Sequence, residues 1–304
     1  MTTPDAQPTD PTAEGPDGEV AAWGAIPTRR LSFDASFAHV PKHFAAGGNV
    51  LASHLAAALS SLFPEGEEFF VGSVRAMRDR VTDPGLKRQV AGFIGQEAVH
   101  GRQHRAFNDR LATLGYPTKR FERMTRHLLA ARKRALAPRV NLATTAALEH
   151  FTATFAELLL ESDEVRNLFS HDAVRDLFVW HALEELEHKA VAFDVYRATG
   201  GTERTRIVMM HLVRLGFLVS VVTEMVVSLL GDRAAYNPRR LLRDWRTVWA
   251  SPLLRGGLWR RLGDYNHRGF HPDDRDTSDL VARWRHELFG PSGALNDKRS
   301  TPAA

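Results

Sequence analysis

One helical segment carries a glutamate and two histidines where a core-facing helix normally has apolar side chains. Between Leu86 and Leu114, apolar residues recur at steps of three and four, the spacing of one helix face. Glu97, His100 and His104 fall on that face, so we expect them to point inward. A buried carboxylate destabilises a fold unless it is paired or binds a metal ion. The fold must therefore supply cations to a helical core.

A second expected helix, over 173–197, repeats this pattern. Glu185 and His188 lie in the middle of its apolar face, with apolar residues toward both ends. The motifs Glu97-x-x-His100 and Glu185-x-x-His188 share the i, i+3 spacing that makes two side chains neighbours on a helix. Each motif offers an oxygen and an imidazole nitrogen, and two such motifs on inward faces are much stronger evidence for a metal site than one.

Three further polar residues accompany these motifs. His181 shares the face of Glu185 and His188, one turn earlier. We count His181 among the predicted metal ligands, with a role as hydrogen-bond partner of a ligand as the alternative. His104 and Glu184 are predicted to act in that outer position, where hydrogen bonds orient the ligands.

Two more helices each offer one inward glutamate. Glu67 lies on the apolar face of a helix that we expect to begin near residue 65, after a break at the FPEG sequence of 63–66. Glu149 lies at the centre of a stripe of small and apolar residues over 140–160. Dinuclear carboxylate bundles combine two Glu-x-x-His motifs with one glutamate from each remaining helix. The predicted metal ligands are thus Glu67, Glu97, His100, Glu149, His181, Glu185 and His188.

Helical periodicity extends over nearly the whole chain, and strand-like alternation is scarce. The sequence therefore predicts an all-α fold with four long helices between about 65 and 200. The segment 207–230 is apolar on nearly all sides, apart from three charged or histidine residues. We expect it to be buried against the bundle or at a subunit interface, with membrane contact as the alternative. Residues 1–28 are predicted to be a disordered leader, 29–270 a helical metal-binding domain, and 271–304 a polar tail.

The composition of the chain excludes several kinds of site and partner. The chain has no cysteine, which excludes disulfides, thiolate metal sites and cysteine nucleophiles. Its formal net charge is only +4 over 304 residues, and no nucleic-acid-binding motif accompanies the basic clusters, so we expect no nucleic-acid partner. No apolar segment follows a basic start, so a secretory signal is not predicted and a cytoplasmic location is expected.

Four sequence blocks resemble a known family. GEEFFVGSVR, FIGQEAVHGRQHRAFN, ALEHFTATFAE and WHALEELEHKAVAFDVY are similar to segments of the bacterial family labelled "predicted metal-dependent hydrolase", over about residues 30–270. Their pattern is also similar to that of the ferritin-like di-iron carboxylate superfamily. The resemblance implies a ferritin-like four-helix bundle, with 207–230 as an additional C-terminal apolar helix. It assigns ligand roles to Glu67, Glu97, His100, Glu149, Glu185 and His188.

The His181-x-x-x-Glu185-x-x-His188 sequence is further similar to the three-histidine site of di-iron N-oxygenases of the 4-aminobenzoate type. The leading hypothesis is therefore an O₂-activating oxidoreductase or oxygenase with two iron ions, acting on a small or lipid-like organic substrate with an electron donor. Manganese or zinc remains an alternative cofactor.

Other functions stay open on the sequence alone. One is a metal-dependent hydrolase that uses a water bridging the two metal ions. Another is iron storage, and a third is a membrane-associated protein with a structural metal. A homodimer and peripheral membrane contact through 207–230 are alternatives for the partners.

Overall fold

The computed structural model describes residues 26–253, 255 and 257–300, and regular structure within them is helical. Strand-like pairing among these residues is limited to one bridge between Leu31 and Arg299. The predicted all-α class is confirmed. Most of the predicted leader, residues 1–25, lies outside the described residues.

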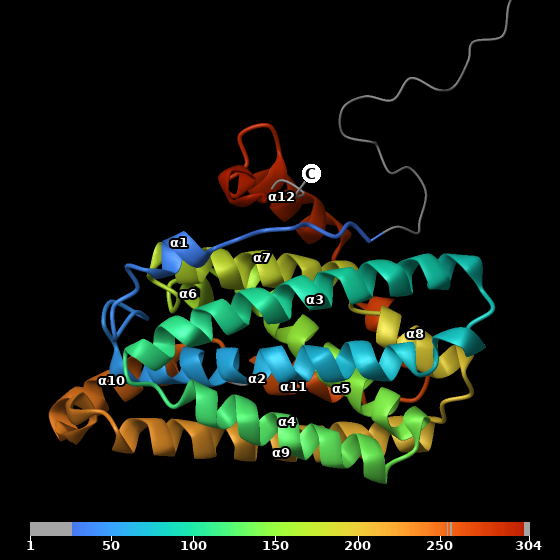
Figure 1. The fold of residues 1–304 in the computed structure, drawn as a ribbon, viewed down its shortest axis with the longest axis horizontal. Helices are drawn as coiled ribbons and strands as arrows, with labels where there is room; N and C mark the ends of the chain where they lie inside the picture. Colours follow the sequence, from blue (N-terminus) through green and yellow to red (C-terminus); the bar gives the residue numbers. More distant parts are fainter. Residues whose placement is uncertain (1–25, 254, 256, 301–304) are drawn as a thin grey trace, which may run out of the picture.

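Two helix pairs form the centre of the molecule (Figure 1). Helix α2 packs most extensively against α3, and α5 packs most extensively against α7; α4 and α9 then pack against both α2 and α5. The helices are α1 (Asp34–Phe37), α2 (Val50–Arg75), α3 (Pro84–Thr113), α4 (Thr118–Ala135), α5 (Pro138–Glu161), α6 (Asp163–Arg166), α7 (Asp172–His188), α8 (Val191–Ala198), α9 (Glu203–Leu230), α10 (Pro238–Ala250), α11 (Gly257–Asp264) and α12 (Ser278–Phe289).

Local sequence signals explain where α2 and α3 begin and where α3 ends. The Asn49 side chain accepts a hydrogen bond from the Ala52 amide at the start of α2, and Asp83 does the same for Leu86 at the start of α3. Pro84 occupies the first turn of α3, where its missing N–H costs nothing. Gly115 follows α3 with φ +91°, a left-handed conformation that favours glycine.

The predicted break at 63–66 is wrong, because α2 continues through Pro64 without interruption. A proline inside a helix leaves the carbonyl four residues earlier without its N–H donor. Here that carbonyl belongs to Ser60, and the Nδ2 group of Asn108 on α3 donates to it at 3.0 Å. A side chain from the neighbouring helix thus replaces the hydrogen bond that Pro64 removes.

Asn108→Ala is expected to destabilise the fold by about 1–3 kcal/mol, because it leaves the buried Ser60 carbonyl unpaired. Pro64→Ala restores a backbone donor to the same carbonyl. The double variant should therefore lose less stability than the two single variants together. Urea unfolding of the four proteins measures this coupling, and strictly additive losses would contradict the compensation.

The predicted single helix over 173–197 is also wrong in part. The structure has a two-residue turn at Lys189 and Ala190, which separates α7 from α8. No glycine or proline lies at this turn, so the sequence carried no local signal for it. His188 consequently occupies the last residue of α7 rather than the middle of a longer helix.

Helix α9 has an unusual distribution of side chains. Three of its charged residues face the protein: Arg206 donates to the carbonyl of His267 at 2.8 Å, Arg214 donates to the carbonyl of Leu262, and Glu224 accepts from Ser61 at 2.6 Å. Large apolar side chains face outward and are about half exposed, at Val208, Leu212, Leu215, Leu218, Val219, Val222 and Val226. The prediction that this segment is buried against the bundle therefore holds for one face only. By length and composition, α9 also meets the criteria for a membrane-spanning helix.

The segment 271–304, predicted to be a polar tail, contains a packed helix within its described part. Val281, Trp284 and Leu288 lie on one face of α12 and are buried, mainly against α7 and α5. The Trp284 indole donates to the carbonyl of Leu160 at 3.1 Å, at the end of α5. Val281, Trp284 and Leu288 are spaced by three and four residues, as on the apolar face of an amphipathic helix. The mostly polar composition of the segment made this pattern easy to miss.

Candidate metal centre

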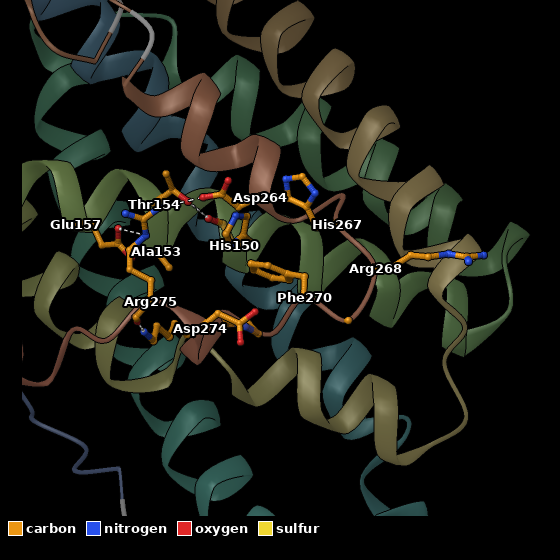
Figure 2. Close-up of a pocket in the computed structure, with 13 residues that line it drawn as sticks. His150, Ala153, Thr154, Glu157, Asp264, His267, Arg268, Phe270, Asp274 and Arg275 are labelled. Atoms are coloured by element: carbon orange, nitrogen blue, oxygen red, sulfur yellow. Dashed lines mark hydrogen bonds and ion pairs between the residues drawn. The ribbon is translucent and has the colours of Figure 1, made fainter.

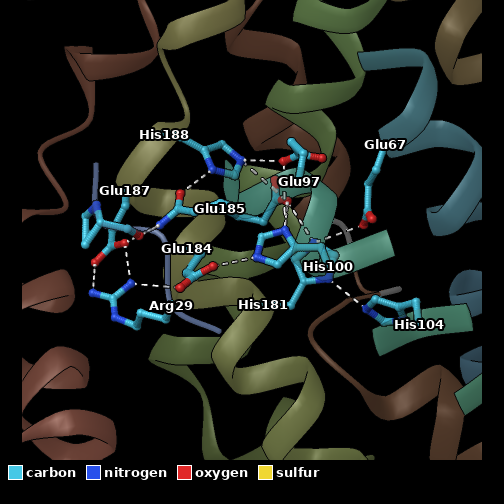
Figure 3. A network of polar contacts seen from close by, with 12 residues as sticks. Arg29, Glu67, Glu97, His100, His104, His181, Glu184, Glu185, Glu187 and His188 are labelled. Carbon is cyan, nitrogen blue, oxygen red and sulfur yellow. Dashed lines mark hydrogen bonds and ion pairs between the residues drawn. The ribbon is translucent and has the colours of Figure 1, made fainter. Parts of the chain in front are cut away.

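The structure brings all seven predicted ligands into one buried cluster in the middle of the central helices. Each of these side chains is at most 4% exposed. Helix α2 supplies Glu67, α3 supplies Glu97 and His100, α5 supplies Glu149, and α7 supplies His181, Glu185 and His188. Figure 3 shows these side chains converging from separate helices.

His188 approaches three carboxylates of the cluster. Its Nε2 atom lies 3.0 Å from Glu97, 3.4 Å from Glu149 and 3.6 Å from Glu185. On the other side of the cluster, His181 Nε2 lies 2.8 Å from Glu185 and 3.7 Å from Glu67.

The donor atoms divide into overlapping groups of three, each with its atoms within 4.8 Å of one another. One group is Glu97, Glu149 and His188, and a second is Glu67, His100 and His181. A third group, Glu97, His100 and Glu185, shares members with both. The shared members are Glu97, a carboxylate, and His100, an imidazole, so the three groups form one continuous set of donors. His181 lies within one of these groups, with Glu67 and His100.

Unpaired polar atoms provide the test of whether metal ions fit here. Both carboxylate oxygens of Glu67 are buried without a hydrogen-bond partner, and so is Nδ1 of His100. Glu97 and Glu149 make no hydrogen bond either; their one close cationic contact is the ion pair with His188 Nε2. Buried polar atoms almost always have partners, because an unpaired one costs about 1–3 kcal/mol. These atoms face one another, and oxygen and imidazole nitrogen are the donors that divalent metals bind. The residues therefore fit a dinuclear metal site.

The pKa values of the cluster glutamates also indicate that the cluster holds more carboxylates than cations. Burial raises the pKa of Glu97 to about 8 and that of Glu149 to about 7, and neighbouring carboxylates add to the shift. Burial and three nearby glutamates hold the pKa of Glu67 well above its usual range. Burial opposes ionisation of Glu185 too, but the charge of His188 holds the Glu185 pKa well below its ordinary value. Protons thus supply the positive charge that metal ions would otherwise provide.

Each imidazole of the cluster is oriented by a hydrogen bond from its outer nitrogen. His188 Nδ1 donates to Gln96 Oε1 at 2.8 Å, which directs Nε2 toward Glu97 and Glu149. Glu184 Oε2 lies 2.9 Å from His100 Nε2. A hydrogen bond to the outer nitrogen of a ligating histidine fixes its tautomer and ring orientation.

His104 supports His181 in the same way. Its Nε2 atom lies 2.7 Å from His181 Nδ1, and its Nδ1 atom lies 2.9 Å from Ser60 Oγ. His104 and Glu184 thus each contact a histidine of the donor groups, and their role in orienting metal ligands stays a prediction. Gln96 was missed, although a signal exists: Gln96 precedes Glu97-x-x-His100 as Glu184 precedes Glu185-x-x-His188. Each of these two residues bonds the histidine of the other motif.

Arg29 was also missed. The chain before α1 runs along α3, where a Cβ on Gly92 or Gly95 would overlap Ile26 or Thr28. This close approach brings the Arg29 guanidinium to 2.9 Å from Glu184 and 2.7 Å from Glu187. Figure 3 shows Arg29 and Glu187 on the opposite side of the cluster from Glu67. Burial raises the pKa of Glu184 to about 8, and Arg29 opposes that shift.

Removing either outer partner is expected to weaken metal binding by about 10–100-fold, the usual effect of losing such a residue. Gln96→Ala frees His188 to rotate, and Glu184→Ala frees His100. Competition with a chelating dye would measure the affinity. Arg102→Ala, on an exposed part of α3, is the control. Unchanged affinity in both variants would show that the imidazoles need no such support.

Two other polar sites differ from this cluster. The pocket in Figure 2 has a volume of about 400 Å³ and holds none of the predicted ligands. Its charges are paired, with Arg275 at 3.2 Å from Glu157 and 3.0 Å from Asp264. A second histidine group places His43 and His54 at 2.7 and 3.1 Å from one oxygen of Asp232. The Lys42 ammonium lies 3.3 Å from the other oxygen, so a cation already neutralises that carboxylate.

Comparison with known proteins gives one match. The sequence model of a family described as "Predicted metal-dependent hydrolase" matches residues 27–276, which include the whole cluster and its outer partners. No curated protein and no solved structure matches the chain.

Proposed function

Because the chain belongs to the family of predicted metal-dependent hydrolases, we propose that its buried cluster holds two divalent metal ions and catalyses hydrolysis. Two ions held here would supply Lewis-acid activation of water and of a substrate carbonyl or phosphoryl oxygen. The observation that carries the proposal is the set of unpaired carboxylate and imidazole atoms that face one another in the core.

The surrounding residues have separate tasks in this proposal. Gln96, Glu184 and His104 hold three imidazoles in place, which keeps the nitrogen lone pairs directed at the metal positions. Thr152 donates its hydroxyl hydrogen to Glu185 and thereby fixes that carboxylate. Nearly complete burial of the cluster excludes bulk water, which strengthens electrostatic interactions within it.

Glu67 is the carboxylate best placed to exchange a proton with substrate. It lines an apolar cavity beside the cluster, and neither of its oxygens has a hydrogen-bond partner. When metal ions replace the protons of the cluster, Glu67 is ionised, and its oxygens can accept a proton from the attacking water.

The test is hydrolysis of p-nitrophenyl octanoate by protein loaded anaerobically with zinc or manganese. We expect metal-dependent hydrolysis without O₂, and a loss of about 100-fold or more in Glu67→Gln, the range of general acid–base effects. Metal content measured on each variant separates loss of metal from loss of proton transfer. Hydrolysis that persists in metal-free protein, or hydrolysis equal in wild type and Glu97→Ala, would refute the proposal.

A second candidate is a di-iron oxidoreductase. The specific observation in its favour is the donor set, since two Glu-x-x-His motifs with two further glutamates are shared by di-iron carboxylate bundles. Anaerobic loading with Fe(II), followed by air, tests it. Iron-dependent uptake of O₂ by the wild type but not by Glu97→Ala would favour this candidate over hydrolysis.

A further inference from the structure

An apolar cavity of about 260 Å³ lies between α2, α4, α5 and α9. Its walls include leucine and phenylalanine side chains from several helices, and glycines leave space on two of them. Among the residues that line it are Leu59, Phe63, Glu67, Leu129, Arg132 and Gly216.

One wall of this cavity is shared with the metal cluster. Glu67 is 1% exposed and belongs to both, with its two oxygens unpaired. The Phe63 ring, also in the cavity wall, packs against His104 and His181 with ring centroids 4.5 and 4.7 Å apart. Thr152 lines the cavity and bonds Glu185. A molecule in the cavity would therefore lie directly beside the cluster.

Arg132 gives the cavity a positive charge without a matching carboxylate. Its guanidinium donates to the Thr144 hydroxyl and lies 3.5 Å from the Met209 sulfur, and no ion pair within the described residues includes it. The Nε atom is buried without a hydrogen-bond partner. Burial lowers the pKa of Arg132, and no acidic neighbour opposes the shift. A guanidinium stays charged at neutral pH, so an apolar wall with this residue favours an anionic ligand.

We propose that this cavity is the substrate site and that it binds an alkyl-chain carboxylate, with the chain along the apolar walls and the carboxylate paired to Arg132. An apolar lining with one fixed charged group is the usual composition of a small-molecule site. The proposal rests on the proposed function only in taking the cluster beside Glu67 as the place of reaction; binding itself is independent of turnover.

Calorimetric titration of zinc-loaded protein with decanoate and with decan-1-ol tests whether the Arg132 guanidinium pairs with a ligand carboxylate. We expect decanoate to bind about tenfold or more tightly than the alcohol, since a charge-assisted guanidinium–carboxylate contact is roughly twice as strong as a neutral one. Arg132→Gln should remove this preference and leave the alcohol unaffected, whereas Arg132→Lys should retain part of it. Arg134→Gln, on the exposed side of the same helix, is the matched control.

Gly216→Leu tests whether the ligand binds in this cavity. Gly216 lines the cavity, and no atom lies within 4 Å of the position that a Cβ would take there, so the substitution starts from open space. Gly216→Leu should weaken the binding of decanoate and of decan-1-ol several-fold, with the metal content unchanged. Gly263→Leu, which also has open space but lies on α11, should bind as the wild type does.

The outcomes separate the two proposals. Failure of decanoate to bind, or equal binding by wild type, Arg132→Gln and Gly216→Leu, would overturn the assignment of this cavity. Arg132-dependent binding by a protein that hydrolyses nothing would support the cavity and count against the hydrolase. Metal-dependent hydrolysis that neither Arg132→Gln nor Gly216→Leu changes would support the hydrolase and count against this cavity as its substrate site.

Discussion

Glu97→Ala is expected to weaken metal binding by more than about 100-fold and to lower the number of metal ions bound per chain from two. Glu97 belongs to two of the three donor groups, one with Glu149 and His188 and one with His100 and Glu185. Its loss therefore removes a donor atom from both of these groups. Loss of residues that only orient ligands already costs about 10–100-fold in affinity, so loss of a shared ligand should cost more.

The metal-free fold should respond much less to the same change. Burial makes the ionised form of Glu97 costly, so removing the carboxylate relieves repulsion while it also removes some packing. A 100-fold loss of affinity corresponds to about 2.7 kcal/mol of stabilisation at saturating metal. Thermal unfolding with and without zinc, together with metal analysis, measures both effects.

Glu224→Ala is the matched control for this experiment. Glu224 is also buried, and burial raises its pKa to about 8, but it lies against Ser61 and in none of the donor groups. It should leave the zinc-induced stabilisation unchanged. If Glu97→Ala bound two ions as tightly as the wild type, the cluster would not be the metal site.

Metal-free protein is expected to lose stability as the pH rises from about 6.5 to about 8. Below this interval the buried His100 and His104, whose pKa values burial lowers, oppose the trend. The carboxyl groups of Glu97 and Glu149 have pKa values of about 8 and about 7 in the folded protein, against 4.5 when unfolded. In this interval the unfolded chain has released protons that the folded chain still holds, so raising the pH favours unfolding. Glu67 and His188, whose pKa values are also raised, act in the same direction. The combined loss should amount to a few kcal/mol.

Bound metal ions should reverse this trend, because they replace the protons in the cluster. Metal affinity and the metal-induced increase in Tm are therefore both expected to be greater at pH 8 than at about pH 6.5. Thermal unfolding at the two pH values, with and without zinc, measures the difference. A metal-free protein that is more stable at pH 8 than at about pH 6.5 would contradict the raised pKa values.

Most of the site could be predicted from the sequence because a helix converts spacing into direction. Glu97 and His100, and likewise Glu185 and His188, had to share one face once their segments were taken as helices. Glu67 and Glu149 followed from the apolar stripes on which they lie. Gln96 and Arg29 could not be found in this way, because their partners are distant in the sequence and depend on how α3, α7 and the chain before α1 pack together.

The errors in the fold have a common cause. Pro64 predicted a helix end, but a side chain from α3 supplies the missing hydrogen bond, which is a tertiary effect. The turn at Lys189 and Ala190 has no local signal at all. For α9, periodicity predicted a helix correctly, but only the packed structure shows that three of its charged residues face inward.

The crossed hydrogen bonds between the two Glu-x-x-His helices have a mechanical consequence. Gln96 of α3 bonds His188 of α7, and Glu184 of α7 bonds His100 of α3. Sliding one helix along the other by a single turn, about 5.4 Å, would break both bonds at once. The axial register of the two helices, and with it the spacing between the two Glu-x-x-His motifs, is therefore set by the polypeptide itself.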